Sequence, residues 1–266
     1  MEIIGYLSAI IIGLVLGLIG GGGSILSVPI FVYVFDFDAV TATTLSLFVV
    51  GITSAVGTVD FAKQKQIDFK TALTFGIPSV LGVLFSRRLV LPNLPEYIIH
   101  RWGITLTKDM FLLLLFSILM LIASYKMIKK IERPRLSKNE EPNYTILISQ
   151  GLLVGIITGL IGAGGGFLIV PALVMLLNLN MKRAVATSLF IIALNSIIGF
   201  LSTMSIVKHD WVFLLTFTAL SVVGIFIGLA ISKKMDGKKL KPVFGWIVLV
   251  MGIFIIVKEI FLKQTY

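Results

Sequence analysis

Two stretches of this sequence are too long to be single membrane helices, and each contains a glycine-rich run. Residues 3–35 and 142–181 carry no charged side chain. As straight helices they would measure roughly 50 and 60 Å, whereas the hydrocarbon core of a bilayer is about 30 Å thick. The glycine-rich runs lie at 20–23 and 162–166, and a glycine inside a helix costs about 1 kcal/mol relative to alanine. We therefore predict that both stretches break into two membrane segments at their glycines.

The two stretches are copies of one another. Residues 17–29 reappear without a gap at 159–171, which is 142 positions further along the chain. The same offset pairs Ser46 with Ser188. A fixed period that holds over so many positions indicates a duplication. We predict a first transmembrane repeat at 1–128, a polar linker at 129–143 and a second transmembrane repeat at 144–266.

Composition places the chain in a membrane. Hydrophobic residues make up 57% of the sequence and charged residues 14%, and the mean hydropathy is +1.04. These values are typical of an all-α polytopic membrane protein surrounded by lipid. The formal net charge of +10 does not indicate nucleic-acid binding, because the basic residues lie in short loops between apolar runs, where they orient a membrane protein. The sequence has no cysteine, which excludes disulfides and thiolate chemistry.

The distribution of basic residues predicts the topology. If each long stretch makes two passes, the chain has ten segments, five per repeat, and 16 Lys and Arg residues gather on one face against 7 on the other. Basic loops stay inside, so we expect the linker at 129–143 in the cytoplasm and both termini outside a cell (inner or plasma) membrane. An odd number of segments inverts the second repeat. Segments 25–35 and 167–178 are short, which leaves both a full crossing and a re-entrant half-helix open.

The apolar runs contain no charged side chain, so a substrate inside the membrane must be held by backbone dipoles and neutral groups. A helix interrupted in the bilayer points free N–H groups and its positive dipole end at the break, which favours an anion. The alternative is close helix packing, which we expect for the Gly-x3-Gly pairs that begin at Gly13, Gly155 and Gly224. The predicted anion-binding residues at the two breaks are Gly22, Gly23 and Ser24 in the first repeat and Gly164, Gly165 and Gly166 in the second.

The helix after each break carries a cluster of polar residues that can donate hydrogen bonds to an oxyanion without carrying charge. The first cluster includes Ser46, and the second includes Thr187, Ser188 and Asn195. We predict that these four residues contribute to the substrate site. Hydroxyl residues also pack between membrane helices, where they bond back to their own backbone, so a structural role for each is the alternative.

The remaining titratable residues do not form a recognisable site. His100 and His209 fall in polar loops without a partner at ligand spacing, which favours a surface role. Asp68 and Asp210 each precede a predicted helix and are expected to be N-caps; binding of a coupling ion is the alternative. We expect neither a metal nor a cofactor.

The repeated motif resembles a known family. The doubled Gly-Leu-Ile-Gly-x-Gly-Gly-x5-Pro signature, followed by Ala-Val-Ala-Thr-Ser-Leu-Phe at 184–190 and by Asn195-Ser196, resembles the sulfite exporter TauE/SafE family of membrane permeases. The second repeat is closer to the pattern, because Leu45 stands where the second repeat has Thr187 and Ser24 replaces Gly166. The resemblance implies an inner-membrane transporter of sulfur-containing anions such as sulfite or organosulfonates.

The leading hypothesis is a secondary transporter that moves a small oxyanion by alternating access between two repeats. The direction of transport and the coupling ion, a proton or sodium, stay open. One alternative is a transporter of a non-anionic metabolite. Another is an intramembrane enzyme with Ser24 as nucleophile, but such catalysis needs a base within hydrogen-bond reach, and neither histidine lies at membrane depth. The partners expected are therefore a small anion and the lipid bilayer, not nucleic acid.

Overall fold

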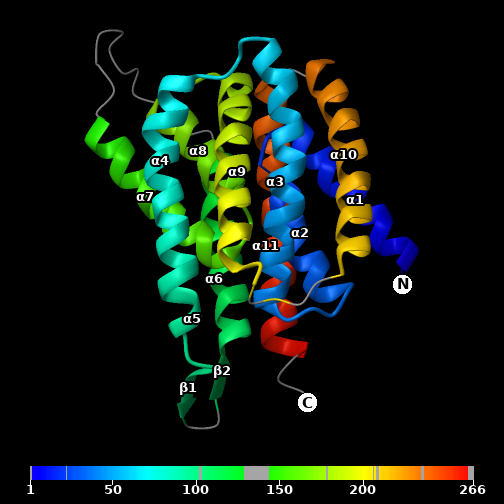
Figure 1. The fold of residues 1–266 in the computed structure, drawn as a ribbon, viewed down its shortest axis with the longest axis vertical. Coiled ribbons are helices and arrows are strands. Elements are labelled where there is room, and N and C mark those ends of the chain that lie inside the picture. Colours follow the sequence, from blue (N-terminus) through cyan, green and yellow to red (C-terminus); the bar gives the residue numbers. More distant parts are fainter. Residues whose placement is uncertain are drawn as a thin grey trace.

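The computed structural model describes residues 2–21, 23–101, 104–128, 144–177, 179–205, 207, 210–234 and 237–262. The linker at 129–143, His209 and Gly22 lie outside these residues, as does the side chain of His100. Within them the fold is a bundle of long helices (Figure 1). The elements of the first part are α1 Glu2–Ile19, α2 Gly23–Tyr33, α3 Ala39–Lys63, α4 Phe69–Phe85, the π-helical segment η1 Ser86–Val90, α5 Leu91–Asn93, β1 Tyr97–Arg101, β2 Ile104–Thr107 and α6 Lys108–Ile128.

The described residues of the second part form five helices and a π-helical segment. Its elements are α7 Tyr144–Ile161, α8 Gly166–Leu176, α9 Met181–Thr203, α10 Trp211–Lys234, α11 Gly237–Val257 and the π-helical segment η2 Lys258–Leu262. Apart from the three-residue α5, the described chain has ten helices, as the ten-segment count predicts. Six of them are long and apolar enough to cross a membrane by length and composition. A short antiparallel hairpin of β1 and β2 is the one departure from an all-α fold in the described residues.

Both long apolar stretches break where the sequence predicts. The first splits into α1 and α2, and the second into α7 and α8. Helices α2 and α8 have 11 residues each, so each extends only about 16 Å at 1.5 Å per residue. That is about half of the hydrocarbon thickness, which means that neither can cross a bilayer by itself. Each forms a hairpin with the helix before it, and the connection from α2 to α3 lies toward the lower end of the bundle (Figure 1).

Helices α3 and α9 form the centre of the bundle. The apolar windows of α3 and α9 are 67% and 72% buried, against 39–44% for the other four candidate spans. The two helices pack against each other, and around them α1 packs against α10, α4 against α7 and α6 against α11. The polar clusters predicted to form the substrate site lie on α3 and α9. The fold therefore places these clusters at the most enclosed position of the molecule.

The Gly-x3-Gly pairs serve close packing, as expected. A side chain on Gly13 of α1 would collide with the backbone carbonyl of Ser221 on α10, and one on Gly155 of α7 would collide with the carbonyl of Ser79 on α4. These two contacts correspond to each other under the 142-residue shift. Gly224 makes the same kind of approach to the carbonyl of Ile10. Backbones can approach this closely only where no Cβ intervenes.

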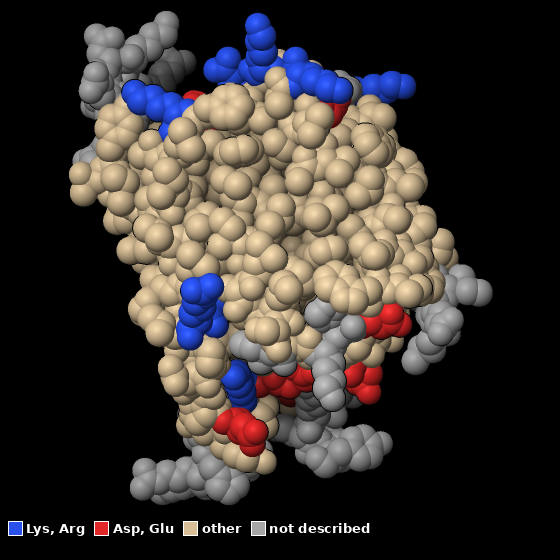
Figure 2. All heavy atoms as spheres, in the orientation of Figure 1, with Lys and Arg blue, Asp and Glu red and all other residues tan. Residues whose placement is uncertain are grey.

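The surface has the charge distribution of a membrane protein. Lys and Arg side chains gather at the upper end of the view in Figure 2, Asp and Glu lie mostly at the lower end, and the band between them is almost entirely uncharged. The α3–α4 connection lies at the upper end, and the β1–β2 hairpin and the C-terminal end lie at the lower end (Figure 1). Large apolar side chains such as Leu153, Phe226 and Trp246 are exposed, as expected for a surface that lipid covers.

Candidate functional site

Glycines with positive φ form the two helix breaks. Gly20 and Gly162 follow α1 and α7 with the same φ of 72°, and Gly164 and Gly165 adopt 62° and 80°. Residues with a Cβ avoid this left-handed region, whereas glycine enters it freely. The glycine-rich runs are therefore needed for the reversal of the chain and not only for helix packing. Because the first N–H groups of α2 and α8 have no partner within their own helix, each break brings backbone donors to the bundle interior.

The two breaks touch each other. A Cβ on Gly21 would lie 2.5 Å from both the carbonyl carbon and the oxygen of Gly166, and a Cβ on Gly166 would lie 2.9 Å from the oxygen of Gly21. Helix α2 also contacts α8. In the described residues the two breaks are thus in direct contact, backbone against backbone.

Several predicted glycines have a more local role at these breaks. Gly23 faces the backbone of α1 at Ile12 and Leu16, and Gly165 faces the side chain of Thr158 on α7. Both therefore allow the short helix to lie close to the helix that precedes it. The Ser24 hydroxyl donates to the carbonyl of Gly21 at 2.7 Å. Gly164 instead points away from its own hairpin, toward Ser196 of α9.

The repeated serines connect the breaks to the central helices. The hydroxyls of Ser46 on α3 and Ser27 on α2 share a hydrogen bond of 2.6 Å. The Ser188 hydroxyl on α9 donates to the carbonyl of Gly20 at 3.0 Å. Both serines are fully buried. Thr187 points elsewhere, because its hydroxyl accepts a hydrogen bond from the backbone N–H of Asp68 at 3.0 Å, next to the N-terminus of α4.

Four buried polar atoms on the central helices α3 and α9 have no hydrogen-bond partner among the described residues. The Asn195 amide nitrogen donates to the Ser79 hydroxyl at 2.7 Å, but its Oδ1 makes no hydrogen bond. A buried polar group without a partner costs about 1–3 kcal/mol, so these atoms would be stabilised by a polar solute. The four atoms are Thr53 Oγ1, Ser54 Oγ, Asn195 Oδ1 and Ser196 Oγ.

A charged residue also lies in this interior, which corrects the prediction that neutral groups alone line it. Arg87 follows directly after an apolar run that ends at residue 86, yet its side chain has no solvent exposure, and Nη1 donates to the Thr44 hydroxyl at 3.2 Å. The signal that could have revealed it is the repeat itself. Under the 142-residue shift, Arg87 corresponds in sequence to Leu229, which lies inside the apolar run 211–232.

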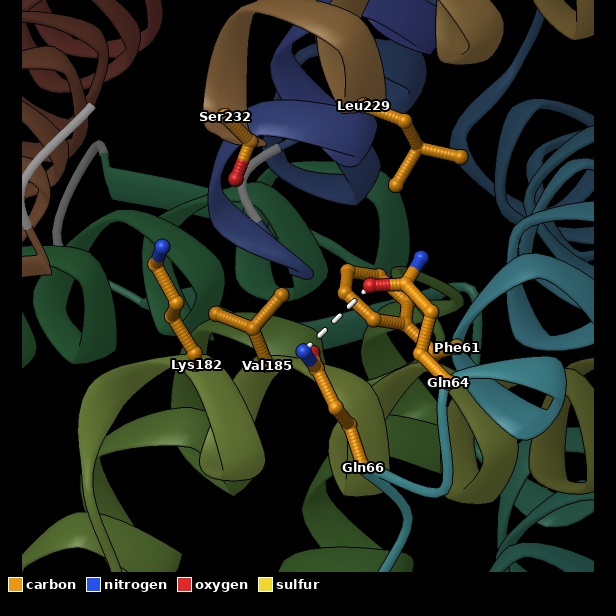
Figure 3. A pocket seen from close by; sticks show the side chains of 7 residues that line it. All are labelled: Phe61, Gln64, Gln66, Lys182, Val185, Leu229 and Ser232. Carbon is orange, nitrogen blue, oxygen red and sulfur yellow. Dashed lines mark hydrogen bonds between the residues drawn. The ribbon is translucent and has the colours of Figure 1, made fainter. Parts of the chain in front are cut away.

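A cavity of about 180 Å³ opens at the basic end of the bundle (Figure 3). Lys182 and Val185 reach it from α9, Leu229 and Ser232 from α10. The Val185 side chain forms its inner end and lies 2.5 Å from the place that a Cβ on Gly20 would occupy. We call this cavity the vestibule, and its lining residues are Phe61, Gln64, Gln66, Lys182, Val185, Leu229 and Ser232.

A second cavity, of about 350 Å³, lies at the opposite end of the bundle, where α2 meets α3. Asp36, Asp38 and Asp109 face it together with Lys258. Asp38 is the N-cap of α3 and accepts a hydrogen bond from the Thr41 N–H at 2.9 Å. Asp68 caps α4 as predicted, accepting from the Thr71 N–H at 3.1 Å. No group of three metal-ligating side chains occurs in the described part of the chain.

Comparison with known proteins identifies the relatives of this chain. The model of the family described as sulfite exporter TauE/SafE matches residues 6–255. A probable membrane transporter protein of Methanocaldococcus jannaschii is 29% identical over 93% of this chain and 94% of its own length. Similar proteins, also named as probable membrane transporters, occur in Bacillus subtilis, at 29% identity over 96% and 99% of the two chains, and in Xylella fastidiosa, at 28% over 92% and 91%. No solved structure matches.

Proposed function

Because the chain belongs to the sulfite exporter TauE/SafE family of membrane transporters, we propose that it carries a small oxyanion along a route between the two helix breaks. The family match and the relatives make it a multi-pass membrane transporter rather than an enzyme. The choice of an anion is our own inference from the chain. Sulfite or an organosulfonate is the substrate that the family description suggests.

The observation that carries this proposal is the vestibule. A positive side chain, Lys182, and two amides, Gln64 and Gln66, stand around its outer part, and its inner end is Val185, packed on Gly20 of the first break. A cavity with positive charge at its mouth raises the local concentration of anions. Beyond Val185, the interior offers the Ser188 hydroxyl and the backbone of both breaks. The basic end of the bundle therefore has the form expected of an anion entrance.

The relation of the two repeats supports alternating access. Contacts at the first break correspond to contacts at the second under the 142-residue shift: Gly20 faces Val185, and Gly162 faces Thr43. Two similar halves around a central site can expose that site to one end or the other by rocking. We infer an inverted pair of repeats, with the linker 129–143 and the vestibule on the cytoplasmic side. Gly22, Gly164, Gly166, Ser46, Ser188 and Asn195 remain proposed substrate contacts.

Purified protein in liposomes tests the proposal. We expect sulfite or methanesulfonate to leave loaded vesicles faster through the wild-type protein than through empty vesicles, and the flux to saturate with concentration because a carrier has a finite number of sites. Neutral and cationic solutes of similar size should not compete. A protein that is folded in these vesicles but moves none of a broad panel of anions would contradict the proposal, and competition by a neutral metabolite would favour the non-anionic alternative.

Charge reversal at the vestibule mouth gives a second test. We expect Lys182→Glu to lower the initial rate of sulfite uptake at subsaturating concentration by about tenfold at low ionic strength, since the mouth then repels anions. The effect should shrink in about 0.5 M salt because exposed charges are screened. Arg183→Glu is the matched control: it makes the same change of net charge on the next residue, which does not line the vestibule. Equal effects of both variants would show that only overall charge matters.

A further inference from the structure

We propose that Arg87 is the residue that recognises the transported anion, and that it selects an oxyanion through its two adjacent donors Nε and Nη2. This inference rests on the proposed function, because it assigns the charged contact of the same route. Arg87 lies at the α7–α8 break, whereas the vestibule lies at the α1–α2 break.

The environment of Arg87 leaves its charge uncompensated. The side chain is completely buried, and only Nη1 makes a hydrogen bond, to the neutral hydroxyl of Thr44. Nε and Nη2 have no acceptor among the described residues, and no carboxylate there forms an ion pair with the guanidinium. Burying a charge without a partner is among the most costly arrangements in a protein. A site of this kind is stabilised when an anion occupies it.

The local backbone aims Arg87 inward. Residues Ser86–Val90 form one turn of π-helix, η1, at the end of α4. π-helical turns are frequent at functional sites. Arg88, the next residue, is exposed. Successive residues of a helix face different directions, so this turn holds one of two consecutive arginines in the bundle and the other on its surface.

Inside the bundle, the guanidinium lies against the second helix break. Nη2 is 2.6 Å from the place that a Cβ on Gly162 would occupy. The guanidinium therefore fits here only because residue 162 is a glycine. Thr43 contacts the same position of Gly162. The unpaired donors of Arg87 and the backbone of the α7–α8 break thus lie together at one place. Both would attract negative charge.

The 142-residue shift relates the position of Arg87 to the vestibule. The 142-residue shift converts Arg87 into Leu229 and Thr43 into Val185. Leu229 and Val185 both line the vestibule, where Val185 lies against Gly20 and Leu229 against Gly17. Arg87 therefore occupies, at the second break, the position that faces the open vestibule at the first break. In a carrier that alternates between two ends, this is where the anion would stand when the other end opens.

The two free donors also restrict the class of anion. Nε and Nη2 lie on the same edge of the planar guanidinium and point in parallel, which matches two oxygens bound to one atom. A sulfite, sulfonate or carboxylate group presents such a pair of oxygens, whereas a halide is a single sphere and can occupy the fork only as a point charge. The geometry points to an oxyanion in preference to chloride.

Ligand-dependent thermal stability of the purified full-length protein, combined with liposome flux, tests this assignment. A ligand that binds only the folded state raises the apparent melting temperature. For the wild-type protein we expect stabilisation by sulfite or methanesulfonate at concentrations at least tenfold below those needed with chloride. For Arg87→Gln we expect that stabilisation to disappear and flux to fall at least 100-fold. Arg88→Gln, an exposed neighbour with the same change of charge, should behave as the wild type.

Arg87→Lys keeps the positive charge but removes the fork, so it remains informative even if Arg87→Gln does not fold. We expect it to bind sulfite about 10- to 100-fold more weakly and to lose most of its preference for oxyanions over chloride. Wild-type affinity and selectivity in Arg87→Lys, or wild-type flux in a folded Arg87→Gln, would overturn the assignment while leaving anion transport intact. A wild-type protein that responds to no anion would instead overturn the proposed function, and this inference with it.

Discussion

Gly166→Ala is expected to lower the apparent melting temperature of the protein by about 5–10 °C. The added Cβ would meet Ile192 Cδ1 at 2.7 Å and the carbonyl oxygen of Gly21 at 2.9 Å, where the two helix breaks cross. Backbone atoms cannot rotate away as a flexible side chain can, so the α2 and α8 hairpins would have to separate. Overpacking of this kind costs about 1–3 kcal/mol, and each kcal/mol lowers the melting temperature of a chain of this size by about 2–4 °C.

The control for this prediction is Gly76→Ala in the middle of α4. A Cβ there would meet Ile191 no closer than 3.5 Å, which is ordinary van der Waals contact. Alanine is also the better helix former by about 1 kcal/mol, so this variant should melt at or slightly above the wild-type temperature. Thermal unfolding in one detergent, with each variant first shown to be monodisperse, provides the comparison. If Gly166→Ala were as stable as Gly76→Ala, the two breaks would not be in backbone contact.

Asn195→Asp is expected to reduce sulfite flux by at least 100-fold while leaving the protein folded. The substitution is isosteric, and the Ser79 hydroxyl can donate to the new carboxylate in place of the bond it now accepts from Asn195. A negative charge at this fully buried position would repel an anion that passes the α3–α9 interface. Two like charges 4 Å apart repel each other by about 4 kcal/mol at an effective dielectric constant of 20, which is more than enough for a 100-fold effect.

The neutral variant Asn195→Ala separates charge from hydrogen bonding. It removes the bond to Ser79 and the unpaired Oδ1 but adds no charge, so we expect a loss of flux of about tenfold, clearly smaller than that of Asn195→Asp. Flux assays in liposomes with equal amounts of folded protein measure the difference. If the aspartate variant transported sulfite as well as the alanine variant, the anion would not pass near Asn195. Faster flux of a cationic solute through Asn195→Asp would indicate a different substrate class.

Local rules were sufficient for much of the fold. Helix length against bilayer thickness required the breaks, and the glycines at 20–23 and 162–166 located them, because chain reversal without a Cβ is a property of glycine alone. The packing role of Gly13, Gly155 and Gly224 followed from their spacing in the same way. The N-cap at Asp68 depends only on residues three positions away. Each of these features depends on interactions between residues a few positions apart or on the thickness of the lipid bilayer.

The parts of the site that sequence could not supply depend on where a side chain points after the helices have packed. Thr187 and Ser188 are neighbours in the chain, but only Ser188 reaches a helix break, since successive residues of a helix face different directions. The sequence also did not show which of the predicted glycines contact the other repeat. Gly166 contacts it, whereas Gly23 and Gly165 face their own hairpins.

By itself the sequence determined a predominantly helical membrane protein whose two long apolar stretches are interrupted at glycines, because bilayer thickness, hydropathy and glycine content are sufficient for that conclusion. Only the tertiary structure decided that Arg87 is inside. Arg87 lies in one turn of π-helix with its side chain inside the bundle, and the missing Cβ of Gly162 provides the space for its guanidinium. That outcome requires residues far apart in the chain to be placed within a few ångströms of one another, and no local pattern encodes such an approach.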